Sequence, residues 1–178
     1  MGENKVQEML QKCDYLSATP HKTHIIGHLQ TNKVKFLPDK VQMIQSVDSE
    51  KLVDEIEKCY GAENKICEVL VEVNIGDEIA KTGINKNDAE SLCYYIAQRQ
   101  HLALKGLMCI PPNCEGDMVR KYFEKMYAMF VDIRAKKLDN SNIDTLSMGM
   151  SGDFDLAIME GATMVRVGTS LFGKRNYN

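Results

Sequence analysis

The feature that most constrains the fold is a regular alternation of two hydrophobic periods along the chain. Short runs rich in β-branched and apolar residues are separated by longer segments whose apolar residues recur every three or four positions. This alternation is typical of βα units arranged around a mainly parallel sheet. The strands predicted on this basis cover residues 24–27, 43–47, 67–74, 104–110, 145–148 and 164–167.

The segments between these strands predict helices. One helix runs through residues 52–60, behind Ser49 as its N-cap, and Gly61 is predicted to stop it. Further helices are predicted over 89–97 and 119–133, and a short one over 154–160. Residues 2–13 also predict a helix, and no strand is predicted before it. We therefore expect the chain to begin inside a βα unit.

Length and composition favour one domain spanning residues 1–178. The chain is 44% apolar, which is enough for a single sizeable core. Its 22 basic and 25 acidic residues show no excess of positive charge of the kind a nucleic-acid-binding domain has. No apolar run approaches the roughly 20 residues of a membrane span, and the first residues do not form a signal peptide. We expect a cytoplasmic protein without nucleic-acid or membrane partners.

Small and hydroxylated residues follow the last two predicted strands, at 147–153 and at 166–170. In parallel α/β folds ligands bind at the carboxyl ends of the strands, and in barrels a phosphate often lies after the last two. Either segment alone is better explained by a turn or a helix cap. Together they favour a phosphorylated ligand, and Arg166 adds a planar donor.

The histidines do not predict a metal site. His21, His24 and His28 are spaced by three and four residues, but they cross the start of a predicted strand, where helical spacing does not apply. We expect structural or exposed histidines and no metal ligands.

Several ordered motifs resemble one known family. They are G-E-N at 2–4, H-I-I-G-H-L-Q-T-N-K at 24–33, V-E-V-N-I at 71–75, K-T-G-I at 81–84, G-L-M at 106–108, L-S-M-G-M-S at 146–151 and V-R-V-G-T at 165–169. In this combination the sequence resembles the pyridoxal phosphate homeostasis protein family (the YggS-like group), from position 2 to about 175. The resemblance implies a single-domain TIM-like (β/α) barrel, similar to the N-terminal barrel of alanine racemase. It further implies binding of pyridoxal 5′-phosphate (PLP) and a part in vitamin B6 and amino-acid homeostasis, without an established reaction.

The resemblance also implies which residues bind the cofactor. Ser151, Gly168 and Thr169 are expected to hold the phosphate, with a neighbouring backbone amide close by. Arg166 is expected at the phosphate or toward the pyridine ring, and this choice stays open. Two asparagines are expected at strand ends that face the same mouth. The full set is Met150, Ser151, Arg166, Gly168, Thr169, Asn4 and Asn74.

The sequence departs from the family in one respect. In the family, a lysine in a V-S-K-type segment before G-E-N forms a Schiff base with PLP, and this sequence has no such segment. We therefore expect a barrel of six βα units that lacks its first two strands and binds PLP without the covalent link. Whether Lys33 or Lys81 substitutes is left open. A complete barrel is expected to be a monomer, whereas exposed strand edges favour association.

Two enzymatic alternatives are kept. A racemase-like PLP enzyme needs the lysine and a second acid–base group, and another phosphate-binding barrel enzyme needs a strand-end lysine or paired carboxylates at the mouth. Neither set is evident in the sequence. A non-catalytic PLP-binding protein is therefore the preferred interpretation, and no catalytic residue is assigned.

Overall fold

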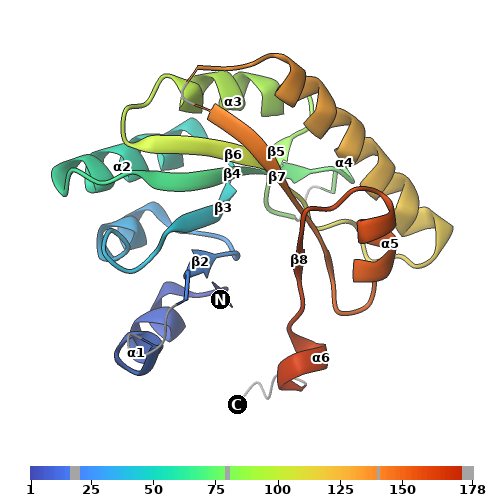
Figure 1. The fold of residues 1–178 in the computed structure, drawn as a ribbon, viewed down its shortest axis with the longest axis horizontal. Coiled ribbons are helices and arrows are strands. Elements are labelled where there is room, and N and C mark those ends of the chain that lie inside the picture. Colours follow the sequence, from blue (N-terminus) through green and yellow to red (C-terminus); the bar gives the residue numbers. More distant parts are fainter. Residues whose placement is uncertain (17–20, 79–80, 140, 174–178) are drawn as a thin grey trace.

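The computed structural model describes residues 1–16, 21–78, 81–139 and 141–173, whose strands form one sheet (Figure 1). Every strand pair in it is parallel, in the order β1-β2-β3-β4-β6-β7-β8, with β5 paired to β4. The strands are β1 (Gly2–Glu3), β2 (His24–Ile25), β3 (Met43–Val47), β4 (Cys67–Asn74), β5 (Ile84–Asn85), β6 (Leu102–Met108), β7 (Ser141–Met150) and β8 (Met164–Arg166). The helices are α1 (Val6–Leu16), α2 (Glu50–Ala62), α3 (Ala89–Ala97), α4 (Asp117–Ala135), α5 (Phe154–Met159) and α6 (Thr169–Phe172), with a 3₁₀ helix η1 (Thr31–Phe36).

The sheet curves into an arc, and α1 to α5 lie on its outer side (Figure 1). β1 and β8 are the two ends of the strand order, and none of the described pairings joins them. A curved parallel sheet with helices outside it is the architecture of a TIM-like barrel. The expected fold class is therefore confirmed, in a form that is open between β1 and β8.

The long strands lie close to where the sequence predicts them. β3 and β4 match the predicted ranges, whereas β6 and β7 begin earlier, at Leu102 and Ser141. Ser141 pairs with Leu104, so β7 extends through polar residues that interrupt its apolar pattern. β2 and β8 end earlier than predicted, at Ile25 and Arg166. β5, which has two residues, is too short to show an alternating pattern and was not predicted.

A strand precedes the first helix, contrary to prediction. Gly2 and Glu3 pair with His24 and Ile25, so the helix predicted over 2–13 begins only at α1. Glu3 is buried, and its Oε1 accepts a hydrogen bond from Lys12 Nζ at 2.8 Å, which ties β1 to α1. The expected absence of two barrel strands stays a prediction.

Helix α2 continues beyond the predicted stop at Gly61. Asn64 takes the left-handed conformation that ends the helix, with a φ of 51°, and the amide of Lys65 donates to the carbonyl of Tyr60 at 3.0 Å. Gly61 lies instead against an imidazole, because a Cβ at this position would come within 3.0 Å of His101 Nδ1. Close packing, not helix termination, therefore explains this glycine.

The sheet is buried on both faces, as β4 illustrates. Val69, Val71 and Val73 belong to the large core between the sheet and the helices. Leu70 belongs to a second, smaller cluster on the inner face of the arc. Burial on both sides explains why the strand is almost continuously apolar, as in other parallel sheets. The inner cluster consists of Met43, Leu70 and Met108, with Ile110 and Met164 packed against it.

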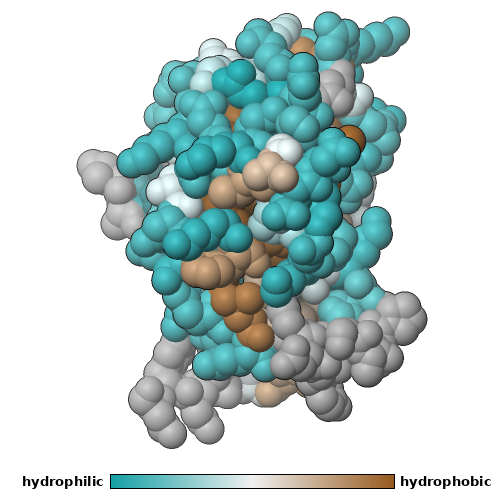
Figure 2. Space-filling model, turned by 90° about the vertical axis from the view of Figure 1, so that its left-hand side faces the viewer, coloured by the Kyte–Doolittle hydropathy of each residue, from teal (hydrophilic) through white to brown (hydrophobic). Residues whose placement is uncertain are grey.

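Within the described ranges, no helix is both long and apolar enough to cross a membrane. Figure 2 shows the face on the left-hand side of Figure 1, which is mostly hydrophilic and carries a narrow apolar stripe.

Candidate functional site

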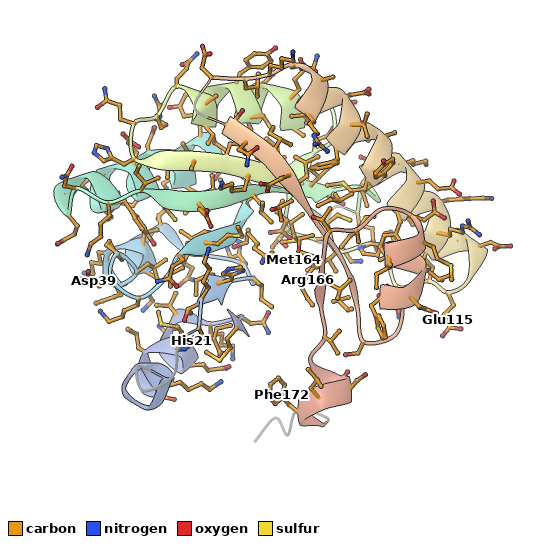
Figure 3. The ribbon with its side chains drawn as sticks, in the orientation of Figure 1. His21, Asp39, Glu115, Met164, Arg166 and Phe172 are labelled. Atoms are coloured by element: carbon orange, nitrogen blue, oxygen red, sulfur yellow. The ribbon has the colours of Figure 1, made fainter. Side chains whose placement is uncertain are left out.

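On the inner face, an apolar layer is followed by a polar layer two residues further along several strands. Because all strands are parallel, the polar layer lies nearer their carboxyl ends, where α/β folds bind ligands. Figure 3 shows Met164 and Arg166 on the inner side of the arc. The apolar and polar members are Met43 and Gln45 on β3, Leu70 and Glu72 on β4, and Met164 and Arg166 on β8.

Arg166 reaches from β8 toward β7 and β6. Its Nη1 donates to the hydroxyl of Ser147, and its Nη2 donates to the carbonyl of Cys109, both at 2.8 Å. Burial is the main cause of a lowered pKa of Arg166, yet a guanidinium remains charged at any physiological pH. The inner face thus holds a positive charge whose orientation is fixed by one bond to β7 and one to the residue that follows β6.

Ser147 connects Arg166 to the opposite wall of the barrel. Its buried hydroxyl donates to Gln45 Oε1 at 2.7 Å, and Gln45 Nε2 lies 3.0 Å from His24 Nδ1 and donates to Met164 Sδ at 3.1 Å. Burial lowers the pKa of His24, so its imidazole is neutral at pH 7 and accepts from the amide. Side chains of β2, β3, β7 and β8 are therefore joined across the interior.

Glu72 is the acidic member of the polar layer. Its Oε1 accepts a hydrogen bond from Thr82 Oγ1 at 2.6 Å, whereas its buried Oε2 has no partner among the described residues. Burial raises the pKa of Glu72, opposed by the hydroxyl of Thr82 and by the charge of Arg166. The carboxyl group therefore keeps one oxygen without a partner among the described residues, and its burial disfavours the charged form.

The two loops predicted to bind phosphate meet. The Ser151 hydroxyl oxygen accepts hydrogen bonds from the backbone amides of Gly168, at 3.2 Å, and Ser170, at 3.3 Å. A Cβ on Gly168 would find no heavy atom within 4 Å, so the space beside these donors is open. Converging amide donors of this kind suit an anion. The predicted convergence is confirmed, and phosphate binding there stays a prediction.

Met150 and Thr169 flank this point. The amide of Met150 donates to Asp153 Oδ1 at 2.6 Å and is therefore engaged at the start of α5. Thr169 is the exposed first residue of α6, directly after Gly168. Both residues lie next to the contact between Ser151 and Gly168. Met150 is the last residue of β7, whereas Thr169 is the first residue of α6.

The two asparagines of the predicted set are placed differently. Asn74 donates through Nδ2 to the carbonyl of Glu78 at 2.8 Å and accepts from the amide of Glu78 at 3.2 Å, so it closes the loop after β4. Asn4 follows β1 with an exposed side chain, and its backbone lies against Gly27. No contact described for either side chain reaches Ser151 or Gly168.

Neither lysine considered as a substitute lies on a strand. Lys81 donates to the carbonyl of Pro111 at 2.9 Å and pairs with Glu78 Oε2 at 2.6 Å. Lys33 is half-buried in η1. Both lysines therefore lie off the strands, as the sequence predicts. Whether either one forms a covalent link to PLP stays open.

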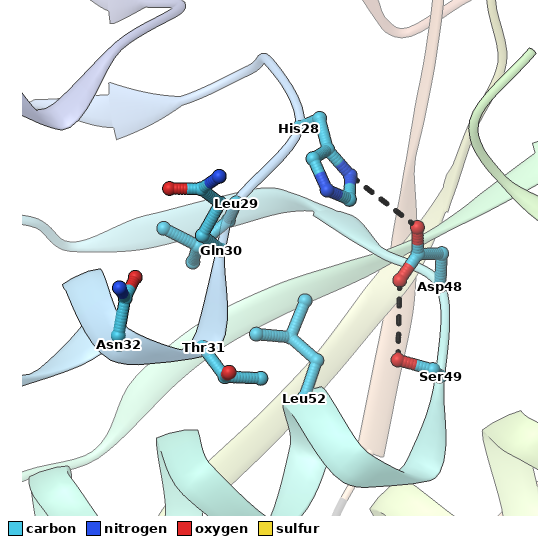
Figure 4. Close-up of a pocket in the computed structure, with 8 residues that line it drawn as sticks. All are labelled: His28, Leu29, Gln30, Thr31, Asn32, Asp48, Ser49 and Leu52. Atoms are coloured by element: carbon cyan, nitrogen blue, oxygen red, sulfur yellow. Dashed lines mark hydrogen bonds and ion pairs between the residues drawn. The ribbon is translucent and has the colours of Figure 1, made fainter.

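A cavity of about 400 Å³ lies at the carboxyl ends of β2 and β3 (Figure 4). His28 Nδ1 lies 3.7 Å from Asp48 Oδ2, and the hydroxyl of Ser49 donates to Asp48 Oδ1 at 3.2 Å rather than capping α2. His28 is largely exposed, as predicted. In the part of the chain that the structure describes, no three His, Cys, Asp or Glu side chains group as metal ligands.

Sequence reasoning missed the polar layer, which comprises Gln45, Glu72 and Ser147 beside Arg166. The available signal was a polar residue inside an otherwise buried strand, two positions after an apolar one, as in Met43 to Gln45. Such a residue faces the interior because strand side chains alternate.

The comparisons with known proteins agree with this architecture. The family model of the alanine racemase N-terminal domain matches residues 1–176. A pyridoxal phosphate homeostasis protein of Aquifex aeolicus is 44% identical over 177 residues, which cover 99% of this chain and 77% of the relative. A pyridoxal phosphate homeostasis protein of Pasteurella multocida is 38% identical over 180 residues, which cover 99% of this chain and 77% of that relative.

Solved structures give the same result. PipY of Synechococcus elongatus, without PLP, superposes with a TM-score of 0.89 at 30% identity, covering 97% of this chain and 80% of PipY. PipY with PLP bound gives 0.86 over the same shares. An alanine racemase of Clostridium difficile, at 13% identity and a TM-score of 0.79, covering 99% of this chain and 45% of the racemase, shares the fold. The chain belongs to the alanine racemase N-terminal domain family and, within it, to the pyridoxal phosphate homeostasis proteins.

Proposed function

We propose that the protein binds PLP and serves in vitamin B6 homeostasis without catalysing a reaction itself. The observation that carries this proposal is the convergence of the Ser151 hydroxyl with the amides of Gly168 and Ser170 beside open space. The relatives named pyridoxal phosphate homeostasis proteins and the PipY structure with PLP bound support the choice of ligand.

The phosphate is assigned to the loops after β7 and β8. One oxygen atom, that of Ser151, already accepts from two backbone amides there, and a phosphate oxygen makes the same kind of contact. Gly168 leaves room for the group because it has no Cβ. The hydroxyl of Thr169 adds a donor, and Met150 contributes only its position in the backbone.

The pyridine ring is assigned to the inner face. Arg166 directs its guanidinium toward Ser147 and Cys109, into the barrel, so we place it at the ring rather than at the phosphate. A guanidinium carries five N–H donors, and these two bonds leave others for the ring. When bound, PLP supplies an aldehyde that reacts with amines. In this proposal Asn4 and Asn74 are the remaining residues that line the mouth of the barrel.

The same proposal places the protein in the cytoplasm, without a nucleic-acid partner, and leaves the covalent lysine unassigned. The near balance of 22 basic and 25 acidic residues supports the absence of nucleic acid. A monomer suffices for binding, since all the assigned residues come from one chain. The edges of β1 and β8, which pair with no further strand in the described part of the chain, are the expected place of any association.

Substitution of Gly168→Ala tests the proposal. Its φ of −117° is negative, so the position does not need the left-handed conformation that favours glycine, and the added methyl group meets no atom of the described chain. The fold is therefore expected to stay intact while the phosphate space is filled. PLP affinity, measured by isothermal titration calorimetry, is expected to fall about tenfold or more. Inorganic phosphate is expected to compete with PLP.

Ser170→Ala is the matched control, because it keeps the backbone amide that contacts Ser151 and removes only an exposed hydroxyl. Its PLP affinity is expected to equal that of the unsubstituted protein. Failure of PLP to bind or to raise the melting temperature of the unsubstituted protein refutes the proposal. Equal affinity of Gly168→Ala and the unsubstituted protein refutes the assignment of the phosphate.

A further inference from the structure

Glu72 leaves one carboxylate oxygen unpaired inside the barrel. The residue is only 3% exposed, and Thr82 satisfies Oε1, but Oε2 has no hydrogen-bond partner among the described residues. Buried polar atoms are paired in the great majority of cases, and an unpaired carboxylate oxygen is costly. A ligand that brings a hydrogen-bond donor to this oxygen would remove that cost.

The charges around Glu72 leave this oxygen available. Arg166, His28 and Asp48 are the charged or titratable groups whose charges act on the carboxyl group, together with the hydroxyl of Thr82. Arg166 donates to Ser147 and Cys109, and His28 is near Asp48. None of the described hydrogen bonds or ion pairs joins a cationic side chain to Oε2.

Glu72, on β4, and the guanidinium of Arg166, which extends from β8, lie on opposite sides of β6 near its carboxyl end. Glu72 is the register partner of Met108, and Arg166 binds the carbonyl of the next residue, Cys109. A ring that contacts Arg166 therefore has a carboxylate across from it. The phosphate loops lie on the β8 side of the mouth, away from β4.

We infer that the site selects a phosphorylated pyridine that carries a primary ammonium group, such as pyridoxamine 5′-phosphate, and that Glu72 Oε2 binds this ammonium. The inference rests on the proposed function, since it uses the same phosphate loops. An aldehyde oxygen facing Oε2 places two acceptors together, whereas an ammonium supplies both donors and the opposite charge. Charge-assisted hydrogen bonds of this kind are the stronger ones.

Binding of three ligands that differ only at this substituent tests the inference. Calorimetric titrations at pH 7.5 compare pyridoxamine 5′-phosphate with pyridoxine 5′-phosphate, which carries an uncharged alcohol, and with PLP. In the unsubstituted protein the amine form is expected to bind about tenfold more tightly than the alcohol form. In Glu72→Gln this ratio is expected to fall to about one, while the alcohol form keeps its affinity.

Glu68→Gln is the matched control. Glu68 lies on the same strand and the same face, four residues toward the amino end, where it pairs with Lys105 at 3.5 Å. Its amine-to-alcohol ratio is expected to stay that of the unsubstituted protein.

The outcomes separate the two proposals. If PLP and the alcohol form bind but the amine form has no advantage, the inference is wrong and the proposed function stands. The same holds if Glu72→Gln weakens all three ligands equally, which indicates a contact to a group they share. If none of the three binds, the proposed function fails and the inference with it. Should Glu72→Gln not fold, the ratio in the unsubstituted protein still decides.

Discussion

Replacing Ser147 with alanine tests whether the side-chain network across the barrel stabilises the fold. The hydroxyl of Ser147 is fully buried, accepts a hydrogen bond from Arg166 at 2.8 Å and donates one to Gln45 at 2.7 Å. Alanine removes both bonds and leaves a buried guanidinium and a buried amide oxygen with fewer partners. The substitution therefore removes interactions without adding volume.

The expected loss follows from the two bonds. A hydrogen bond to a charged group contributes about 1.5–3 kcal/mol, and one between neutral groups contributes about 0.5–1.5 kcal/mol. Their combined loss lowers the free energy of unfolding of Ser147→Ala by about 2–4 kcal/mol. For a chain of this size each kcal/mol lowers the melting temperature by about 2–4 °C, so the melting temperature falls by about 5–15 °C.

Urea denaturation followed by far-ultraviolet circular dichroism measures this loss, with the slope of the transition expected to stay constant. Ser170→Ala serves as the control, because its hydroxyl is exposed, and its free energy of unfolding is expected to change by less than about 0.5 kcal/mol. If Ser147→Ala matches this control, the network does not stabilise the fold and the reasoning is refuted.

Three further substitutions follow from local geometry. Gly106→Ala is expected to lose more than about 4 kcal/mol in urea denaturation, because φ is 150° and the new Cβ would lie 1.9 Å from the carbonyl oxygen of Thr145; near-normal stability contradicts this. Tyr60→Phe removes the hydroxyl that donates to the carbonyl of Val41 at 2.9 Å, and thermal unfolding should show a loss of about 1–2 kcal/mol; an unchanged melt rejects the bond as stabilising. Burial raises the pKa of Glu72 in the folded state, so its protonated form stabilises the fold at low pH and that contribution is lost as pH rises through the folded-state pKa. The free energy of unfolding of Glu72→Gln should therefore rise relative to that of the unsubstituted protein as the pH is raised from 4 to 8. If the difference in urea midpoint between the two proteins does not change with pH, the raised pKa of Glu72 is wrong.

Strands that are buried on both faces were predictable, and strands held by their neighbours were not. β4 is an apolar run whose two faces enter two different clusters, so its bounds are visible in the sequence. β1 has two residues and forms because the backbone of β2 pairs with it. The stop at Gly61 failed for a related reason, since the packing of His101, a residue distant in the sequence, determines that position.

The part of the site that backbone amides form could be predicted from the sequence. The part that side chains form inside the barrel could not. Glycine and serine after the last two strands indicated the loops that meet at Ser151 and Gly168. Gln45 and Ser147 interrupt apolar strands, and only the curvature of the sheet shows that they face one another. Asn74 is a polar residue at a strand end, as expected of a site residue, yet its side chain is engaged within its own loop.

The hydrogen bond between Ser147 and Gln45 joins β7 to β3, two strands that β4 and β6 separate in the sheet. It therefore ties β3 to β7 across the interior of the arc, where none of the described backbone pairings joins them. In the proposed site, a ligand bound by Arg166 is connected to this bond, because the guanidinium donates to the hydroxyl of Ser147. If ligand binding is coupled to the spacing of β3 and β7 through this connection, reciprocity requires that a change of that spacing alters ligand affinity by the same free energy. Affinity for the proposed ligand would then depend on the shape of the sheet as well as on the contacts within the site.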